Sequence, residues 1–243
     1  MNKIIIVGAT SGIGLELTKI FIHKGWRVGI AGRREHLLST FKKNFPEQVE
    51  YEVIDITEAT APQKLTQLIH KIGGMDIYFH SSGVGFQNPQ LTLNIELQTV
   101  KTNVLGFTQL IDTAFQHFEK TEKGHIAVIS SIAGTKGLGV APAYSATKRF
   151  QNTYIDALEQ LAHLKKLNIH FTDIKPGFVQ TALLDGGGKY PLLMNPQKVA
   201  DKIYQSIVNK KRSVIIDWKY RLIVTIWKLI PHTLWKRLPI KTR

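Results

Sequence analysis

The sequence predicts an α/β protein with one Rossmann-like, doubly wound domain, in which helices cover both faces of a parallel sheet. Three observations predict this fold. Short apolar runs alternate with longer amphipathic stretches along the chain, and the first run passes directly into the glycine-rich sequence GATSGIG. No proline- or glycine-rich linker separates two cores. A chain of 243 residues is long enough for one large α/β domain.

The apolar runs indicate buried strands, because consecutive β-branched residues without a helical period are typical of a parallel sheet. These runs are KIIIVGA, RVGIAG, VEYEVIDI, MDIYFH, HIAVIS, IHFTDI and SVIID. Amphipathic segments between them predict helices over residues 12–24, 35–45, 62–72, 91–120, 143–167 and 196–209. Repeated strand–helix alternation favours right-handed βαβ units.

Composition and charge exclude several classes of protein. The chain contains no cysteine, which excludes disulfides and thiolate metal sites and suits a reducing compartment such as the cytoplasm; no metal centre is predicted. No apolar run reaches the roughly 18 residues that a membrane-spanning helix needs. The N-terminal run is too short for a signal peptide.

The net charge is +14, and ten basic residues but one acidic residue follow position 209. Such a charge is compatible with nucleic acid, anionic lipid or simple solubility. No recognised nucleic-acid-binding motif supports the first of these, and no nucleic-acid partner is predicted.

The sequence GATSGIG predicts a phosphate-binding turn between the first strand and the first helix. Gly8 permits a tight turn, Gly12 lets the backbone approach a diphosphate, and Gly14 lets the helix pack against the strand. The N-terminus of the following helix offers N–H groups to an anion. A glycine-rich turn without a ligand is the alternative interpretation.

The second predicted strand ends in AGRR, which bears on the choice of cofactor. Gly32 occupies the place where an NAD site usually has an acidic residue. Arg33 and Arg34 follow, and a guanidinium matches a phosphate in both geometry and charge. The sequence therefore predicts NADP(H), with Arg33 as the more direct contact; a solvated arginine pair is the alternative.

The sequence AYSATKRF places Tyr144 and Lys148 four residues apart on a predicted helix, so both side chains point the same way. Tyrosine has an ordinary pKa of about 10, and a nearby ammonium lowers it. Such a pair can pass a proton to or from an alcohol oxygen. Ser131 ends a predicted strand, where doubly wound folds bind their substrates.

Taken together, these sequences resemble the short-chain dehydrogenase/reductase family over about residues 3–217. The matching pieces are GATSGIG, Asp55-Ile56, Asn103 in KTNVLG, Ser131, YSATK and PGFVQT. The resemblance implies a sheet of seven parallel strands. It also implies hydride transfer between nicotinamide C4 and a carbonyl or alcohol carbon.

The resemblance implies a role for each catalytic residue. Tyr144 would be the acid/base, Ser131 would hold the substrate oxygen, and Lys148 would bind the nicotinamide ribose and lower the pKa of the tyrosine. Asn103 would hold a water that links Lys148 to a proton relay. Asp55 would meet the adenine, and Thr181 with the backbone near Val179 would meet the carboxamide. The full set of predicted cofactor contacts is Gly8, Thr10, Ser11, Gly12, Ile13, Gly14, Arg33, Arg34, Asp55, Ile56, Ser82, Gly83, Tyr144, Lys148, Pro176, Gly177, Val179 and Thr181.

The chain departs from the family at two places that should be neighbours in the sheet. Val7 stands where the family usually has threonine, and His80-Ser81-Ser82-Gly83 stands where it usually has NNAG. We expect the polar link between these strands to be absent and cofactor binding to be retained. His80 is expected to be a hydrogen-bonded histidine at a strand end rather than a catalytic group.

Residues 182–196 contain three consecutive glycines and are expected to form a flexible lid over the substrate. Its apolar side chains would line a pocket for a lipophilic ketone or alcohol; a disordered surface loop is the alternative. These side chains are Leu183, Leu184, Tyr190, Leu192, Leu193 and Met194.

The predicted function is that of an NADPH-dependent carbonyl reductase or alcohol dehydrogenase. The alternative is a non-catalytic NADP(H)-sensing or scaffold protein on the same fold. The resemblance also implies a homodimer or homotetramer, paired through the helices over residues 91–120 and 143–167.

We predict a catalytic domain over residues 1–217 and a basic, aromatic extension over residues 218–243. Residues 218–230 form a predicted helix that Pro231 ends. At roughly 20 Å it is too short to cross a bilayer of ~30 Å. Its tryptophans and basic residues are typical of a helix in the membrane interface, which would give peripheral membrane contact through residues 218–238. One alternative is packing against the body of the protein or a partner subunit. Another is a place beside the substrate entrance, since this helix follows the last strand.

Overall fold

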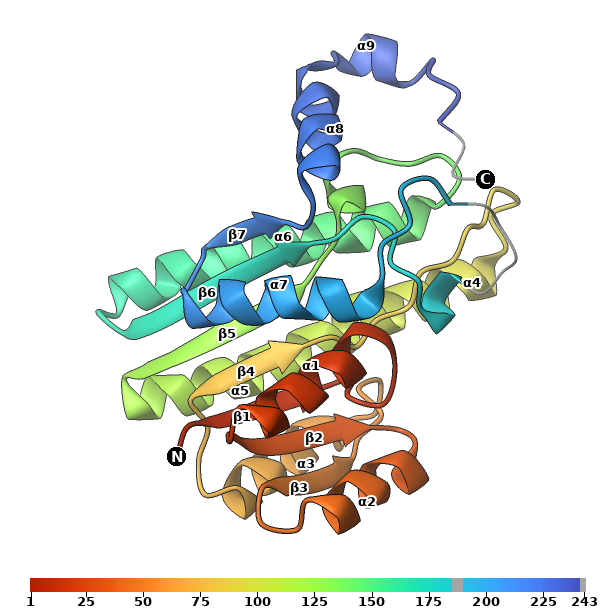
Figure 1. Cartoon of the computed structure of the whole chain (residues 1–243). Coiled ribbons are helices and arrows are strands. Elements are labelled where there is room, and N and C mark those ends of the chain that lie inside the picture. The colour runs from red at the N-terminus through yellow and green to blue at the C-terminus, as the bar shows by residue number, and fades with distance from the viewer. Residues whose placement is uncertain (185–189, 241–243) are drawn as a thin grey trace.

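The computed structural model describes residues 1–184 and 190–240. Within this part of the chain, seven strands form one parallel sheet in the order β3-β2-β1-β4-β5-β6-β7 (Figure 1). The strands are β1 (Lys3–Val7), β2 (Arg27–Gly32), β3 (Val49–Val53), β4 (Ile77–His80), β5 (Lys123–Ile129), β6 (Asn168–Lys175) and β7 (Ser213–Ile215). The predicted doubly wound sheet of seven parallel strands is confirmed.

Helices cover both faces of the sheet, as Figure 1 shows. One face carries α1 (Gly12–His23), α2 (Glu35–Asn44) and α7 (Pro196–Val208), and the other carries α3 (Ala61–Lys71), α5 (Phe107–Thr121) and α6 (Pro142–Leu164). Alternate residues of β1 supply the two cores. Ile4 and Ile6 pack with the first helix layer, whereas Ile5 and Val7 pack with the second. This alternation follows from the two-residue period of a strand.

The helix predicted over residues 91–120 contains an irregular turn. It begins as α4 (Leu93–Val100), passes through a π-helical segment, η1 (Lys101–Gly106), and continues as α5. Gly106 lets this segment pass close to the turn after β3, because an added Cβ there would lie 2.7 Å from the Ile56 carbonyl oxygen. A π-helical turn inside a helix is frequent at functional sites.

Two predicted boundaries differ from the structure. Helix α6 ends at Leu164, three residues before the prediction, and Lys166 then adopts a φ of 56° that no right-handed helix contains. Strand β3 ends at Val53, so Asp55 and Ile56 lie in the turn that follows it. Short 3₁₀ turns, η2 (Ile132–Thr135) and η3 (Ala182–Leu184), follow β5 and β6.

Beyond β7 the chain forms α8 (Trp218–Leu229), as predicted, and α9 (His232–Trp235), which was not predicted. Both helices stand away from the sheet beyond its carboxyl edge (Figure 1). Trp235 anchors α9, because its Nε1 donates to the Gly137 carbonyl at 2.8 Å and its ring meets Trp227 at 5.3 Å. Among the described residues, no helix combines the length and the apolar character needed to cross a membrane.

Candidate active site

A cavity of about 1280 Å³ opens at the carboxyl ends of the strands. It extends from the turn between β1 and α1, past the end of β5, to α8. Ser131, Tyr144 and Lys148 line it, and so do all the predicted cofactor contacts except Gly14. Asn103 is fully buried and lies outside the lining. The sequence motifs therefore meet in one cavity, although they are far apart along the chain.

The glycines of GATSGIG are required by close backbone approaches. Gly8 has a φ of 92°, and an added Cβ would lie 2.8 Å from the Ser82 nitrogen. Gly12 has a φ of 53°, and its Cβ would meet the Thr181 side chain at 3.0 Å. A Cβ on Gly14 would lie 2.2 Å from the Gly8 carbonyl oxygen. Gly14 therefore lies in the contact between α1 and β1 rather than in the wall of the cavity.

The two arginines after β2 differ in how firmly they are held. The guanidinium of Arg34 donates to Thr10 Oγ1 through Nε at 3.1 Å and Nη2 at 2.9 Å. The Arg33 side chain is 74% exposed and lies 4.0 Å from the Asp55 carboxylate. Burial alone would raise the pKa of Asp55, but hydrogen bonds from Thr57, with the charges of Arg33 and Lys101, lower it below the ordinary value.

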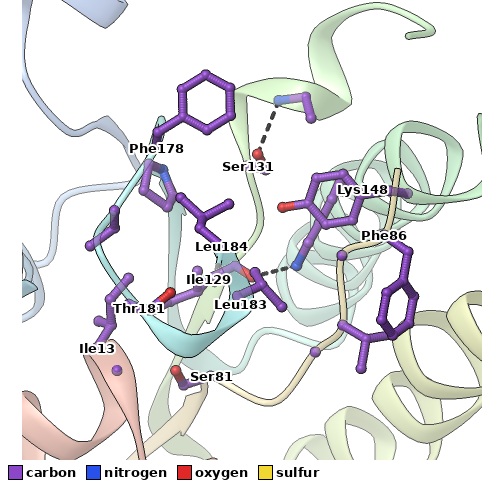
Figure 2. A pocket seen from close by; sticks show the side chains of 18 of the residues that line it. Ile13, Ser81, Phe86, Ile129, Ser131, Lys148, Phe178, Thr181, Leu183 and Leu184 are labelled. Carbon is purple, nitrogen blue, oxygen red and sulfur yellow. Dashed lines mark hydrogen bonds between the residues drawn. The ribbon is translucent and has the colours of Figure 1, made fainter. Parts of the chain in front are cut away.

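Ser131 and Tyr144 present their hydroxyls to the cavity. The Ser131 Oγ accepts a hydrogen bond from the Ala133 N–H at 3.1 Å, at the start of η2 (Figure 2). Burial raises the pKa of Tyr144, and a hydrogen bond with Ser131 opposes this shift only in part. The sequence analysis instead predicts a lowered pKa of Tyr144, because of the nearby Lys148 ammonium. The Lys148 Nζ lies 5.9 Å from the centre of the tyrosine ring, and burial has the larger effect on the phenol.

Lys148 is buried, and two protein acceptors hold its ammonium. Its Nζ donates to the Ile129 carbonyl at 3.1 Å, as Figure 2 shows, and to Gln151 Oε1 at 2.9 Å. Burial lowers the pKa of Lys148 to about 8, and the charge of Asp173 opposes this shift.

Gln151 is a residue that the sequence analysis did not identify. Its Nε2 donates to the backbone carbonyl of Asn103 at 3.0 Å, where the resemblance implies a bridging water. The Asn103 side chain holds the loop after β4, because it accepts from the Val84 N–H at 2.9 Å and donates to the Val84 carbonyl at 2.7 Å. The only sequence signal for Gln151 is its position three residues after Lys148 on the same helix.

The structure explains the departures at Val7 and His80, which are paired in adjacent strands. A backbone bond from the Ser81 N–H to the Val7 carbonyl, 2.8 Å long, joins the strands there without a side-chain donor. His80 is fully buried and outside the cavity lining. Its Nδ1 bonds the Tyr78 hydroxyl at 2.9 Å, which agrees with the expected hydrogen-bonded histidine. Among the described residues, no group meets the geometry of a hydrogen bond to its Nε2. Burial, with the charge of Lys148, lowers the pKa of His80 to about 3.

The substrate end of the cavity is apolar, but its walls differ partly from the prediction. Leu183, Leu184, Tyr190 and Leu192 line it as predicted. Leu193 is exposed instead, and Met194 packs into the cores beside α7 and α8. The three glycines of the predicted lid lie outside the described residues. Tyr220, Ile223 and Trp227 of α8 also line the cavity, which agrees with the alternative that this helix borders the substrate entrance. Further lining residues that the sequence analysis missed are Phe86, Leu138, Phe178 and Ile240.

Comparisons with known proteins agree with this arrangement. The family model for short chain dehydrogenase matches residues 2–188. An uncharacterized oxidoreductase of Myxococcus xanthus is 28% identical over 237 residues, which cover 95% of this chain and 93% of the relative. Dehydrogenase/reductase SDR family member 7B of Xenopus tropicalis is 24% identical over 239 residues, which cover 88% of this chain and 76% of the relative.

Solved structures share the fold. A structure titled ElxO with NADP bound has a TM-score of 0.80 at 21% identity and covers 91% of this chain and 99% of its own. A variant of actinorhodin polyketide ketoreductase with NADPH has a TM-score of 0.77 at 21% identity and covers 88% of this chain and 95% of its own. Since the family model spans most of the sequence and the fold agrees, the chain belongs to the short-chain dehydrogenase family of oxidoreductases.

Proposed function

We propose that the protein is an NADPH-dependent carbonyl reductase that acts on a lipophilic ketone in the cytoplasm, or the corresponding alcohol dehydrogenase in reverse. One observation carries this proposal. Ser131, Tyr144 and Lys148 face the same cavity as the glycine turn after β1 and the arginines after β2. Two solved structures of similar fold, one with NADP bound and one with NADPH, support the choice of cofactor.

The residues present fit NADP(H). Gly8 and Gly12 leave a cradle that side chains would fill, at the N-terminus of α1 where a diphosphate is favoured. Arg34 lies in the cavity wall with its guanidinium oriented by Thr10, which suits a phosphate on the adenine ribose. When bound, NADPH supplies the hydride that reduces the carbonyl carbon.

The chain's own residues handle the substrate oxygen and the proton. The Ser131 hydroxyl accepts from the Ala133 N–H and hydrogen-bonds Tyr144, and it turns its hydrogen to the carbonyl oxygen when the ketone binds. Tyr144 donates its proton to that oxygen as negative charge develops there. Because burial raises the pKa of Tyr144, the phenol stays protonated at neutral pH, which suits reduction. The Lys148 ammonium stabilises the phenolate that remains.

The walls of the cavity support a lipophilic substrate. Phe178, Leu183 and Leu184 lie on one side, and Phe86 lies on the other (Figure 2). Ile223 and Trp227 of α8 extend the same apolar lining. A long-chain or polycyclic ketone would bury its apolar surface here, at about 25 cal/mol per Å².

A comparison of wild type with Tyr144→Phe tests the proposed function. We expect the wild type to consume NADPH with at least one member of a panel of lipophilic ketones. The phenylalanine variant should lose at least about a hundredfold in kcat, because the proton donor is absent, and should keep its affinity for NADPH. Spectrophotometric rates and a fluorescence titration of NADPH measure the two quantities. Equal rates for the two proteins would refute the assigned role of Tyr144.

We also propose that the protein forms a homodimer or homotetramer through α4 and α6. Exposed leucines on both helices support this pairing, among them Leu93 and Leu97 on α4 and Leu161 and Leu164 on α6. Light scattering that gives the mass of one 27.4-kDa chain would contradict it.

Residues 218–238 are further proposed to contact a membrane peripherally, through the outer face of α8. Trp218, Leu222, Ile226 and Leu229 recur at helical spacing, and each is at least 50% exposed. The inner face of the same helix packs on the protein through Tyr220 and Val224. Lys219, Arg221 and Lys228 border this stripe on α8, and Lys236 and Arg237 follow further along the chain. This combination favours an anionic bilayer over a second copy of the chain, whose identical basic rim would repel it.

Vesicle binding tests the membrane proposal. We expect wild type to sediment with vesicles containing phosphatidylserine and to be released by salt, since the basic residues act through screened charge. The double variant Trp218→Ser, Leu229→Ser should bind at least about tenfold more weakly, because it loses apolar surface. Val208→Ser, at an exposed apolar site on α7, is the matched control. Equal binding by all three proteins would remove the membrane contact.

A further inference from the structure

Gln151 connects the catalytic helix to the irregular segment that contains Asn103. It lies on α6, three residues after Lys148, and its side chain is fully buried. Its Oε1 accepts a hydrogen bond from Lys148 Nζ at 2.9 Å, and its Nε2 donates to the Asn103 carbonyl at 3.0 Å. Both ends of the amide are therefore used, and the Asn103 contact fixes which end faces the lysine, because a backbone carbonyl can only accept.

The two partners of Gln151 are themselves immobilised. Asn103 belongs to the π-helical segment η1, and its side chain bonds both backbone atoms of Val84 and the Thr147 hydroxyl. Lys148 has three ammonium hydrogens. One goes to the Ile129 carbonyl and one to Gln151, so the third remains for the cavity that Lys148 lines.

Charged groups around Lys148 come from several elements. Asp173 of β6 raises the pKa of Lys148, but this carboxylate also pairs with Lys175 Nζ at 3.1 Å and bonds Asn152 and Ser130. His80 of β4 is neutral at working pH, with a pKa of about 3. Tyr144 lies one turn away on α6, and Glu96 of α4 accepts from the Ala143 N–H at the start of that helix. Among the described residues, none of these carboxylates forms a direct ion pair with Lys148.

We propose that Gln151 is a positioning residue that holds Lys148 in its ammonium form and aims its third hydrogen into the cavity. It does so by linking Lys148 directly to the Asn103 carbonyl through the two ends of its amide. This inference rests on the proposed function, since it assigns Gln151 a part in the same reaction. A buried ammonium without this acceptor would lose its proton at lower pH, because burial already disfavours the charge.

The pH profile of ketone reduction tests this role, using Gln151→Met and Gln151→Glu, which keep the length of the side chain. In wild type we expect kcat/KM to fall near pH 8 as Lys148 loses its proton, because the pKa of Tyr144 is higher. We call this fall in kcat/KM at high pH the alkaline limb. In Gln151→Met, which removes the acceptor of Lys148, the limb should move about one pH unit lower. In Gln151→Glu, which adds an opposite charge, it should move about one unit higher.

The design separates positioning from a structural role. The position of a pH limb does not depend on the fraction of folded enzyme, so partial unfolding of a variant lowers the rate without moving the limb. Gln48→Met is the matched control: Gln48 Nε2 also donates to a backbone carbonyl, that of Ile22 at 3.0 Å, in the turn before β3. Its limb should match wild type.

Two results would overturn the inference: limbs that stay in place in both Gln151 variants, or limbs that move in the same direction. Neither result would touch the proposed function, which fails separately if wild type reduces no ketone or if Tyr144→Phe retains the wild-type rate. Opposite shifts together with an unmoved control support the role of Gln151.

Discussion

Arg34 enters the cavity with its guanidinium already oriented, because two of its nitrogens donate to one hydroxyl of Thr10. Gly32 leaves room for Thr10, since a Cβ there would lie 3.2 Å from the Thr10 side chain, a tight contact. The sequence favours Arg33 as the direct contact. The Arg33 side chain is largely exposed, however, and its guanidinium lies 4.0 Å from the carboxylate of Asp55.

We therefore expect Arg34→Ala to weaken NADPH binding more than Arg33→Ala does. Hydrogen bonds to a charged group contribute about 1.5–3 kcal/mol, so the loss for Arg34 should be roughly ten- to hundredfold. NADH lacks the additional phosphate, and its affinity should not change in either variant. Fluorescence titrations with both nucleotides measure this. A parallel loss of NADH affinity would show that Arg34 supports the turn rather than the phosphate.

At the residue scale, the sequence predicts those site residues whose positions depend on nearby residues alone. Tyr144 and Lys148 share a helix face, and the glycines after β1 are required by backbone contacts. The role of Gln151 was not predictable, because its environment comes from segments distant in sequence. The direction of the Tyr144 pKa was wrong for the same reason: burial is a tertiary property.

Helix α8 connects the C-terminal extension to the substrate loop through one tyrosine. The Tyr220 hydroxyl accepts from the Phe178 N–H at 3.1 Å and lies 3.0 Å from the Pro191 carbonyl, which it can donate to. These two residues flank the loop that follows β6. Gly177 accommodates the ring, because an added Cβ would lie 2.2 Å from Tyr220 Cζ.

Tyr220→Phe should loosen this loop. The variant leaves the Phe178 N–H without its acceptor, which costs about 1–3 kcal/mol for a buried group. We expect a lower free energy of unfolding and a severalfold higher KM for the ketone. Urea denaturation and steady-state kinetics measure the two effects. Tyr204→Phe, whose ring packs on Phe21 away from the cavity, is the control. An unchanged KM and stability would mean that α8 does not support the loop.

At the element scale, the long periodic helices and the strands were predicted closely, and the irregular pieces were not. The π-helical turn at Asn103 lies where Gly106 packs against the turn after β3, a tertiary contact that local periodicity does not reveal. Helix α9 is only four residues long and depends on the bond from Trp235 to Gly137, almost a hundred positions away.

The whole molecule owes its site to the order of its strands. Strands β1 and β4 are neighbours at the centre of the sheet, where the chain changes direction, and parallel strands bring their carboxyl ends to one edge. The glycine turn, Ser131 and the PGFVQT segment follow different strands and so meet at that edge. Helix α8 covers the far end of the same cavity. The sequence predicts that these motifs meet at one edge of the sheet. For the C-terminal extension it left two readings open, a membrane contact and a wall of the site. The structure shows that the inner face of α8 lines the cavity.

Transfer of deuterium from NADPH labelled at nicotinamide C4 to a long-chain ketone tests the central claim most directly. Wild type should place deuterium on the former carbonyl carbon, detected by mass spectrometry of the alcohol. Tyr144→Phe should yield almost no labelled alcohol while still binding NADPH. Binding of NADPH by wild type without labelled product from any ketone in a broad lipophilic panel would contradict the account and favour a non-catalytic role for this fold.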